Sequence, residues 1–177
     1  MLNALTIEIA MGARRWRASR SFTLIELVVT IVILAVLGAF AFPRLADLRS
    51  DAHRASVATT AAQLQSAITL ANIACRLKSF AGLDNLPAYG SGELDFNSAC
   101  YPVSTSDQNV RVNPGRCAEV WTAVLSLAPS VAVGGGIADY RAGGNNTTCT
   151  FTYQLDPNST RTIEYDSATG EVTAVNP

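Results

Sequence analysis

The chain has 177 residues, with 13 Lys and Arg against 14 Asp and Glu, so its formal net charge at pH 7 is −1. This length suits one modest domain, and a near-neutral balance without a basic patch beyond the N-terminal region argues against generic nucleic-acid binding. One His and singly scattered acidic residues offer no group of side chains for catalysis or metal binding. The sequence therefore predicts no enzyme, no catalytic residues, no cofactor and no metal site.

Residues 1–21 form a basic N-terminal region, with four Arg residues against one acidic residue, Glu8. Basic residues beside the N-terminal end of a membrane-spanning segment keep that end in the cytoplasm. We therefore expect residues 1–21 to be a leader on the cytoplasmic side, and the part of the chain after the apolar segment to be translocated.

Residues 22–43, FTLIELVVTIVILAVLGAFAFP, contain one ionisable side chain, Glu26. As a helix, the 21 residues before the proline rise about 31 Å, close to the hydrocarbon thickness of a bilayer. In lipid the backbone must satisfy its own hydrogen bonds, so the segment is helical there despite its β-branched residues. The sequence predicts one membrane-spanning helix over this range.

Glu26 is unusual in such a helix. An acidic side chain costs up to about 2.5 to 3.5 kcal/mol at the bilayer centre and less near the headgroups. The carboxylate either snorkels or is protonated at the interface, or it pairs with a positive group.

The string SFTLIEL at residues 21–27, with basic residues before it and a long apolar run after it, resembles the processing motif of type IV prepilins and of type II secretion pseudopilins. This resemblance implies that a prepilin peptidase cuts between Ser21 and Phe22 and methylates the new amine of Phe22. It also implies that Glu26 pairs with a terminal amine in the growing filament. The family usually has Gly before the cut, whereas this chain has Ser21.

Pro43 sits where many members of this family have a proline that interrupts the helix in the assembled fibre. Gly38 and Pro43 are also the weak points of the segment by elementary chemistry, because Gly is a poor helix former and Pro lacks a backbone donor. We expect the helix break at these two residues.

Residues 44–78 continue the helix with an amphipathic surface. Apolar residues recur at alternating spacings of four and three, which is typical of one helix face. This face consists of Val57, Ala61, Leu64, Ile68, Ala71 and Cys75. We expect one long helix over residues 22–78, apolar all round at first and amphipathic afterwards.

Residues 79–177 are expected to form a globular head, in which a long connecting loop precedes an antiparallel sheet. Alternation with period two places Cys149, Phe151, Tyr153 and Leu155 on one face of a first strand. The other expected elements are at least one strand near 94–103, a short helix over 117–127 with Trp121 as a core anchor, flexible turns over 130–144, and strands over 162–165 and 172–175. The fold class is α+β, and the resemblance implies the type IV pilin fold.

Four cysteines lie in the translocated part of the chain: Cys75, Cys100, Cys117 and Cys149. An even count in an oxidising compartment favours two disulfides, and no pair has the spacing of a zinc site. Each bridge would contribute about 3 kcal/mol by the chain-entropy estimate. The sequence leaves all three pairings open.

The resemblance implies a structural pilin that polymerises through its N-terminal helix into a type IV pilus (fimbrium) for adhesion, motility or interaction with DNA or phage. Its partners would be other pilin subunits, the prepilin peptidase and the pilus or secretion assembly machinery of the bacterial inner membrane. The chain would be an inner-membrane protein before assembly and an extracellular filament afterwards. Residues 43–56 and the pair Tyr101-Pro102 further resemble the MSHA (mannose-sensitive haemagglutinin) pilins.

Three alternatives remain open. The chain could be a pseudopilin of a type II secretion system, or a monomeric membrane-anchored binding protein without a polymer state. The basic region and the apolar run also fit a secretory signal that ends at Ala39-Phe40-Ala41, in which case the mature chain would begin at Phe42.

Overall fold

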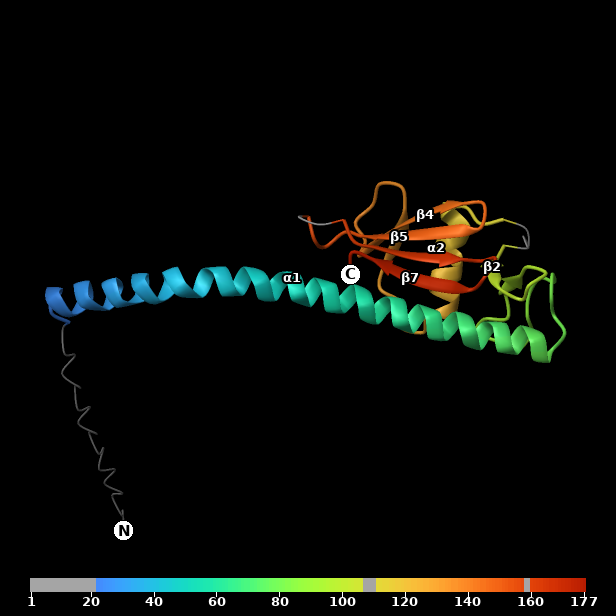
Figure 1. Ribbon diagram of the computed structural model, residues 1–177, viewed down its shortest axis with the longest axis horizontal. Helices are drawn as coiled ribbons and strands as arrows, with labels where there is room; N and C mark the ends of the chain where they lie inside the picture. Colours follow the sequence, from blue (N-terminus) through green and yellow to red (C-terminus); the bar gives the residue numbers. More distant parts are fainter. Residues whose placement is uncertain (1–21, 107–110, 158–159) are drawn as a thin grey trace, which may run out of the picture. The chain divides into compact units, whose positions relative to one another are not determined.

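A computed structural model describes residues 22–106, 111–157 and 160–177 of the chain, except for the side chains of residues 42–47. The predicted leader, residues 1–21, lies outside the described residues. The chain divides into two compact units, one that ends at Pro43 and one from Arg44 to Pro177. Helix α1, Leu24–Leu77, contributes residues to both units (Figure 1).

The predicted long helix is confirmed, with its ends moved inward by one or two residues. Thr23 is the N-cap, and its hydroxyl accepts a hydrogen bond from the backbone N–H of Glu26 at 3.2 Å. At the other end Ser79 has a left-handed backbone conformation, and the N–H of Phe80 donates to the carbonyl of Cys75. This is the hydrogen bond of a Schellman motif, which satisfies a carbonyl that the helix leaves free.

α1 is helical at Gly38 and at Pro43. The break that the resemblance implies at these residues concerns the assembled fibre, so it stays a prediction for that state.

The second unit is built on a five-stranded sheet in the order β3-β4-β5-β6-β7. Its strands are Val131–Val133, Tyr140–Asn145, Thr148–Tyr153, Thr162–Asp166 and Glu171–Val175. The part of α1 in this unit and helix α2, Pro114–Val124, enclose the main hydrophobic core together with one face of the sheet (Figure 1). All six residues of the predicted apolar face of α1 are buried.

α2 begins three residues before the predicted helix and ends three residues before its predicted end. Asn113 caps it by accepting a hydrogen bond from the N–H of Arg116 at 3.0 Å, and Pro114 occupies the first turn, where a missing N–H costs nothing. Trp121 is fully buried and donates from its indole N–H to the carbonyl of Pro129, so its prediction as a core anchor is confirmed.

One prediction about the sheet is wrong, because residues 130–144, expected to form turns, contain β3 and most of β4. β4 to β7 pair antiparallel as predicted, and β3 joins β4 in parallel, so the sheet is mixed. The close packing around Gly144 explains why β4 contains glycine. A Cβ at this position would lie 2.7 Å from Sγ of Cys117, so only glycine lets β4 pass this close to the start of α2.

β5 buries Cys149, Phe151 and Tyr153 as the alternation predicts, but it ends at Tyr153. Leu155, expected on the same face, lies beyond the strand and is 53% exposed. The expected strands over 162–165 and 172–175 correspond to β6 and β7.

The loop before α2 contains two short antiparallel strands, β1 (Asp95–Phe96) and β2 (Pro102–Ser104), in the range where at least one strand is expected. This loop packs around a second hydrophobic cluster, whose members include Cys75, Leu86, Leu94 and Phe96. The cluster fastens the loop to the C-terminal end of α1.

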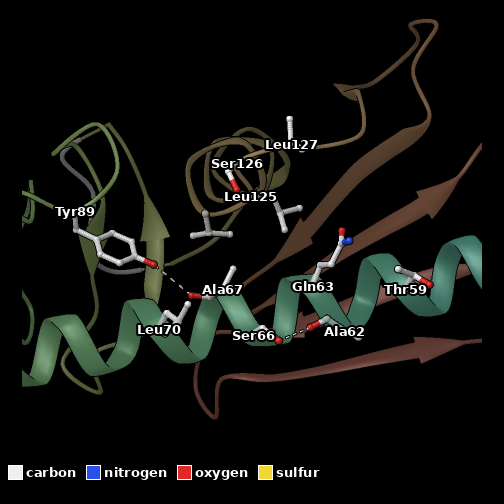
Figure 2. Close-up of a pocket in the computed structure, with 11 residues that line it drawn as sticks. Thr59, Ala62, Gln63, Ser66, Ala67, Leu70, Tyr89, Leu125, Ser126 and Leu127 are labelled. Atoms are coloured by element: carbon white, nitrogen blue, oxygen red, sulfur yellow. Dashed lines mark hydrogen bonds between the residues drawn. The ribbon is translucent and has the colours of Figure 1, made fainter.

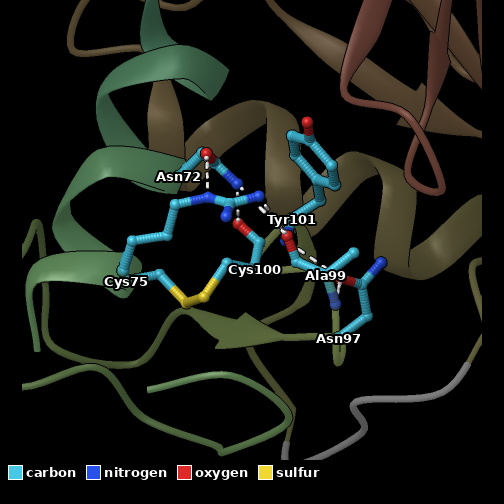
Figure 3. The surroundings of a disulfide bond; sticks show 7 residues. Asn72, Cys75, Asn97, Ala99, Cys100 and Tyr101 are labelled. Atoms are coloured by element: carbon cyan, nitrogen blue, oxygen red, sulfur yellow. Dashed lines mark hydrogen bonds between the residues drawn. A yellow bond between two sulfur atoms is a disulfide. The ribbon is translucent and has the colours of Figure 1, made fainter. Parts of the chain in front are cut away.

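Two disulfides are present, as predicted, and they pair Cys75 with Cys100 and Cys117 with Cys149. Figure 3 shows the first one, with Asn72 beside it on α1. The amide of Asn72 donates to the carbonyl of Cys100 at 2.8 Å, and the carboxamide oxygen of Asn97 accepts from the N–H groups of Ala99 and Tyr101. A covalent bond and side-chain hydrogen bonds therefore hold the same turn against the helix.

Candidate functional site

The N-terminal unit exposes an apolar helix surface. From Phe22 to Ala41 all residues are exposed except Gly38, which is half-buried. The window Leu24–Ala41 has a mean hydropathy of 2.7 and is long and apolar enough to cross a membrane, by length and composition. Exposed apolar surfaces of this extent mark sites that meet lipid or other protein chains.

Thr23 and Glu26 form the first turn of this helix. Their spacing is that of a capping box, in which a Thr at the N-cap accepts a hydrogen bond from the backbone of a Glu three residues later. The positive end of the helix dipole also favours a carboxylate in the first turn. Sequence reasoning missed the role of Thr23, although the Thr-x-x-Glu spacing was available as a signal.

Glu26 itself is exposed. Within the part of the chain that the structure describes, the close ion pair is between Arg161 and Asp156, and it does not involve Glu26. In the single chain the carboxylate is thus stabilised by its place at the helix start and by water.

Phe22 lies one residue before the cap and is 77% exposed. Ser21, the residue on the other side of the predicted cut, lies outside the described residues, as does the leader. The structure therefore brings Phe22, Thr23 and Glu26 together at one helix end, with the exposed apolar surface directly after them.

The four predicted cysteines serve the head and not a reactive site, because all of them are in disulfides. Among the described residues, no group of three or more His, Cys, Asp or Glu could hold a metal ion.

A polar cluster that sequence reasoning did not foresee attaches α1 to the sheet within the second unit. Arg161 and Asp156 form a buried ion pair at 3.0 Å, and Arg161 also donates to the hydroxyl of Ser50 at 3.1 Å. Nearby on α1, Nδ1 of His53 lies 3.0 Å from the hydroxyl of Tyr153. The contacts to α1 join residues about a hundred positions apart, so no local pattern could reveal them.

Comparison with known proteins gives two matches. A family described as the prokaryotic N-terminal methylation motif matches residues 16–42. The type IV narrow pilus major component PilA5 of Thermus thermophilus is 34% identical over 104 residues, which are 59% of this chain and 85% of that protein. No solved structure matches the chain significantly. The narrower resemblance to the MSHA pilins stays a prediction.

Proposed function

Because this chain belongs to the type IV pilin family and is a structural pilin subunit, we propose that it is cut between Ser21 and Phe22, methylated at Phe22, and polymerised through α1 with Glu26 as the assembly carboxylate. Before assembly it is held in the inner membrane, with the leader in the cytoplasm and residues 44–177 on the far side. After assembly the helices form the core of an extracellular filament, whose outer surface serves adhesion, motility or interaction with DNA or phage.

The observation that carries this proposal is the exposed apolar helix with a single carboxylate in its first turn. When copies of the helix pack together, they bury this surface from water. An unpaired carboxylate left in such a core would cost several kcal/mol, so Glu26 needs a positive partner there.

Cleavage creates that partner. Before the cut, the nitrogen of Phe22 is an uncharged peptide nitrogen, and after the cut it is a terminal amine that carries a positive charge. The amine lies beside the positive end of the helix dipole, which disfavours it within its own chain. Pairing with Glu26 of a neighbouring copy neutralises both the amine and the carboxylate. Because the amine exists only after the cut, only processed chains have the two groups that assembly requires.

The orientation in the membrane follows from charge. The four Arg residues of the leader precede the spanning segment, and positive residues are retained on the cytoplasmic side. The prepilin peptidase and the assembly machinery would then meet the leader and the start of α1 at the inner membrane.

The relative named above is a component of a pilus, which favours a surface filament over the pseudopilus of a secretion system. Recovery of the chain from sheared surface filaments would support the pilus. A chain found exclusively in the periplasmic space of secreting cells would support the pseudopilin.

The role of Glu26 is tested by Glu26→Gln, which removes the charge and keeps the size. We expect this variant to insert into the membrane and to be cleaved at Phe22, but to be at least about tenfold less abundant in filaments, the loss that about 1.4 kcal/mol would give. The measurement compares immunoblots of sheared filaments with those of the membrane fraction.

Glu93→Gln provides the matched control, because Glu93 is an exposed carboxylate of the head. It should assemble like the unsubstituted chain. Normal incorporation of the Glu26→Gln chain would contradict the pairing role.

A further inference from the structure

A groove of about 540 Å³ lies between α1 and the residues that follow α2, wholly within the second unit. Figure 2 shows Ser66 and Leu70 of α1 on one side, Leu125 and Leu127 on the other, and Tyr89 at one end. A hydrogen bond from the hydroxyl of Tyr89 to the carbonyl of Ala67 ties that end to α1. The volume of the groove is in the range of pockets that bind small ligands.

Among the described residues, no charged side chain lines this groove. The sequence of α1 contains no Asp, Glu, Lys, Arg or His from residue 55 to residue 75, which covers the whole length of the groove. Leu70 and Leu127 at its rim are 61% and 94% exposed. A charged occupant would lose hydration here without gaining a charged partner, so the groove fits an uncharged one. Thr59, Gln63, Ser66 and Ser126 are polar members of its lining, and Leu70, Leu125 and Leu127 favour an apolar occupant beside them.

The same chain has an apolar protrusion at the loop between β3 and β4. Ile137 is 109% exposed, the largest value for a large hydrophobic side chain among the described residues, and Val133, the last residue of β3, is 51% exposed. Between them, a Cβ at Gly134 or Gly135 would meet nothing within 4 Å, and one at Gly136 would lie 3.3 Å from the Cβ of Ala132 in β3. Apart from this contact with its own strand, the loop leaves Ile137 free to contact another molecule.

A groove and a complementary protrusion at different places on one chain make a head-to-tail contact, and such contacts generate open filaments when they do not close into a ring. We propose that the β3–β4 loop of one copy inserts Ile137 into the groove between α1 and the residues that follow α2 of a neighbouring copy. This contact joins neighbouring heads, in addition to the helix packing of the proposed function. The inference rests on the proposed function, because the contact requires the polymer.

Cysteine cross-linking in filaments tests this contact. The four native cysteines are in disulfides, so cysteines introduced by Ser66→Cys and Ile137→Cys would be the reactive thiols. With both changes in one chain, oxidation of intact filaments should give a ladder of covalent multimers. Either change alone should give no ladder, because a head-to-tail contact brings two different positions together.

The control chain combines Ser66→Cys with Leu155→Cys, since Leu155 is also exposed but does not line the groove or belong to the β3–β4 loop. If filaments of the chain with Ser66→Cys and Ile137→Cys give no more multimers than filaments of this control chain, the docking contact is overturned and the pilin function is left intact. Absence of filaments from the unsubstituted chain would instead overturn the proposed function.

A charge-exchange series tests the same contact without thiols. Ile137→Asp or Leu127→Asp should lower the yield of shear-resistant filaments by about tenfold, the effect of about 1.4 kcal/mol, because each buries an unpaired charge in the contact. Ile137→Asp together with Leu127→Lys should recover much of the yield, whereas Leu155→Asp should have little effect. Equal yields across the series, or no recovery in the double variant, would overturn the proposal. Both positions are exposed, and unchanged Trp121 fluorescence would verify that each variant folds.

Discussion

Thr23 determines where α1 begins and thereby where Glu26 stands. Its hydroxyl holds the backbone N–H of Glu26, which fixes the first turn and leaves Phe22 just outside the helix. The amine that the proposed cleavage would create at Phe22 would therefore lie at the helix end and not within it. The TLIE string caps the helix and places a carboxylate near Phe22, where the proposed mature chain would begin.

Gly144 is a residue of the head that has no room for a side chain. A Cβ there would lie 2.7 Å from Sγ of Cys117 and from the backbone of Asn113, neither of which can move freely. We predict that Gly144→Ala lowers the free energy of unfolding by about 1 to 3 kcal/mol, the usual cost of overpacking. Urea unfolding of the mature chain in detergent, followed by the fluorescence of Trp121, would measure this loss.

Gly143→Ala is the control on the same strand, because its Cβ would make ordinary contacts at 3.5 Å and beyond. The close approach of β4 to α2 would be refuted if both variants were equally stable.

Among the elements, residues 79–100 of the connecting loop and the sheet depend on different clusters. Cys75–Cys100 fastens the loop to α1 within the smaller cluster, whereas Cys117–Cys149 joins α2 to β5 within the main core. Each bridge closes a loop whose chain entropy corresponds to about 3 to 4 kcal/mol.

We predict that Cys75→Ser with Cys100→Ser loosens residues 79–100 and leaves the sheet protected, because the main core, to which Val103 belongs, keeps its contacts. Hydrogen exchange of the mature chain, read by mass spectrometry, would report this as faster exchange confined to the loop. The pair Cys117→Ser and Cys149→Ser should instead speed exchange in α2 and the sheet. Uniform effects from both pairs would argue against separate clusters.

The elements differ in how far their sequence predicts them. α1 is predicted well, because Val57, Leu64 and Ile68 repeat at helical spacing and bury as expected. β4 is missed because glycine is a weak strand former, and the tight contact at Gly144 that requires it comes from the distant Cys117. β3 is missed because it is short and three glycines follow it directly. The early start of α2 was visible in the Asn113-Pro114 pair, a cap followed by a proline in the first turn.

The residues of the candidate site also differ in how far the sequence predicts them. Phe22 and Glu26 follow from a local motif, so sequence was enough to propose them. The attachment of α1 to the sheet through Ser50, Asp156 and Arg161 depends on contacts between residues far apart in sequence, which only the folded head provides. The disulfide pairing could not be predicted for the same reason, because no sequence spacing distinguishes the three possible sets of pairs.

The free energy of unfolding of the whole head should fall as the pH rises into the alkaline range. Burial raises the pKa of Tyr165 well above its ordinary value of 10.0, and burial also raises the pKa of Tyr89 and of Tyr140. As the pH rises through about 10, the unfolded chain loses phenolic protons that the folded chain keeps. Their contribution to the free energy of unfolding is therefore fully present below this pH and lost above it.

We expect urea unfolding of the mature chain to show a falling midpoint above about pH 10, and Tyr165→Phe to make this fall shallower. Midpoints of the Tyr165→Phe chain that fall as steeply as those of the unsubstituted chain would show that Tyr165 does not cause the dependence.

At the scale of the molecule, the central claim is that cleavage before Phe22 produces a subunit that assembles through α1. Mass spectrometry of the N-terminal peptide of this chain, recovered from sheared surface filaments, tests it most directly. The expected peptide begins at Phe22 and carries one methyl group on its amine. A filament chain that begins at Phe42, or that keeps the leader, would contradict it.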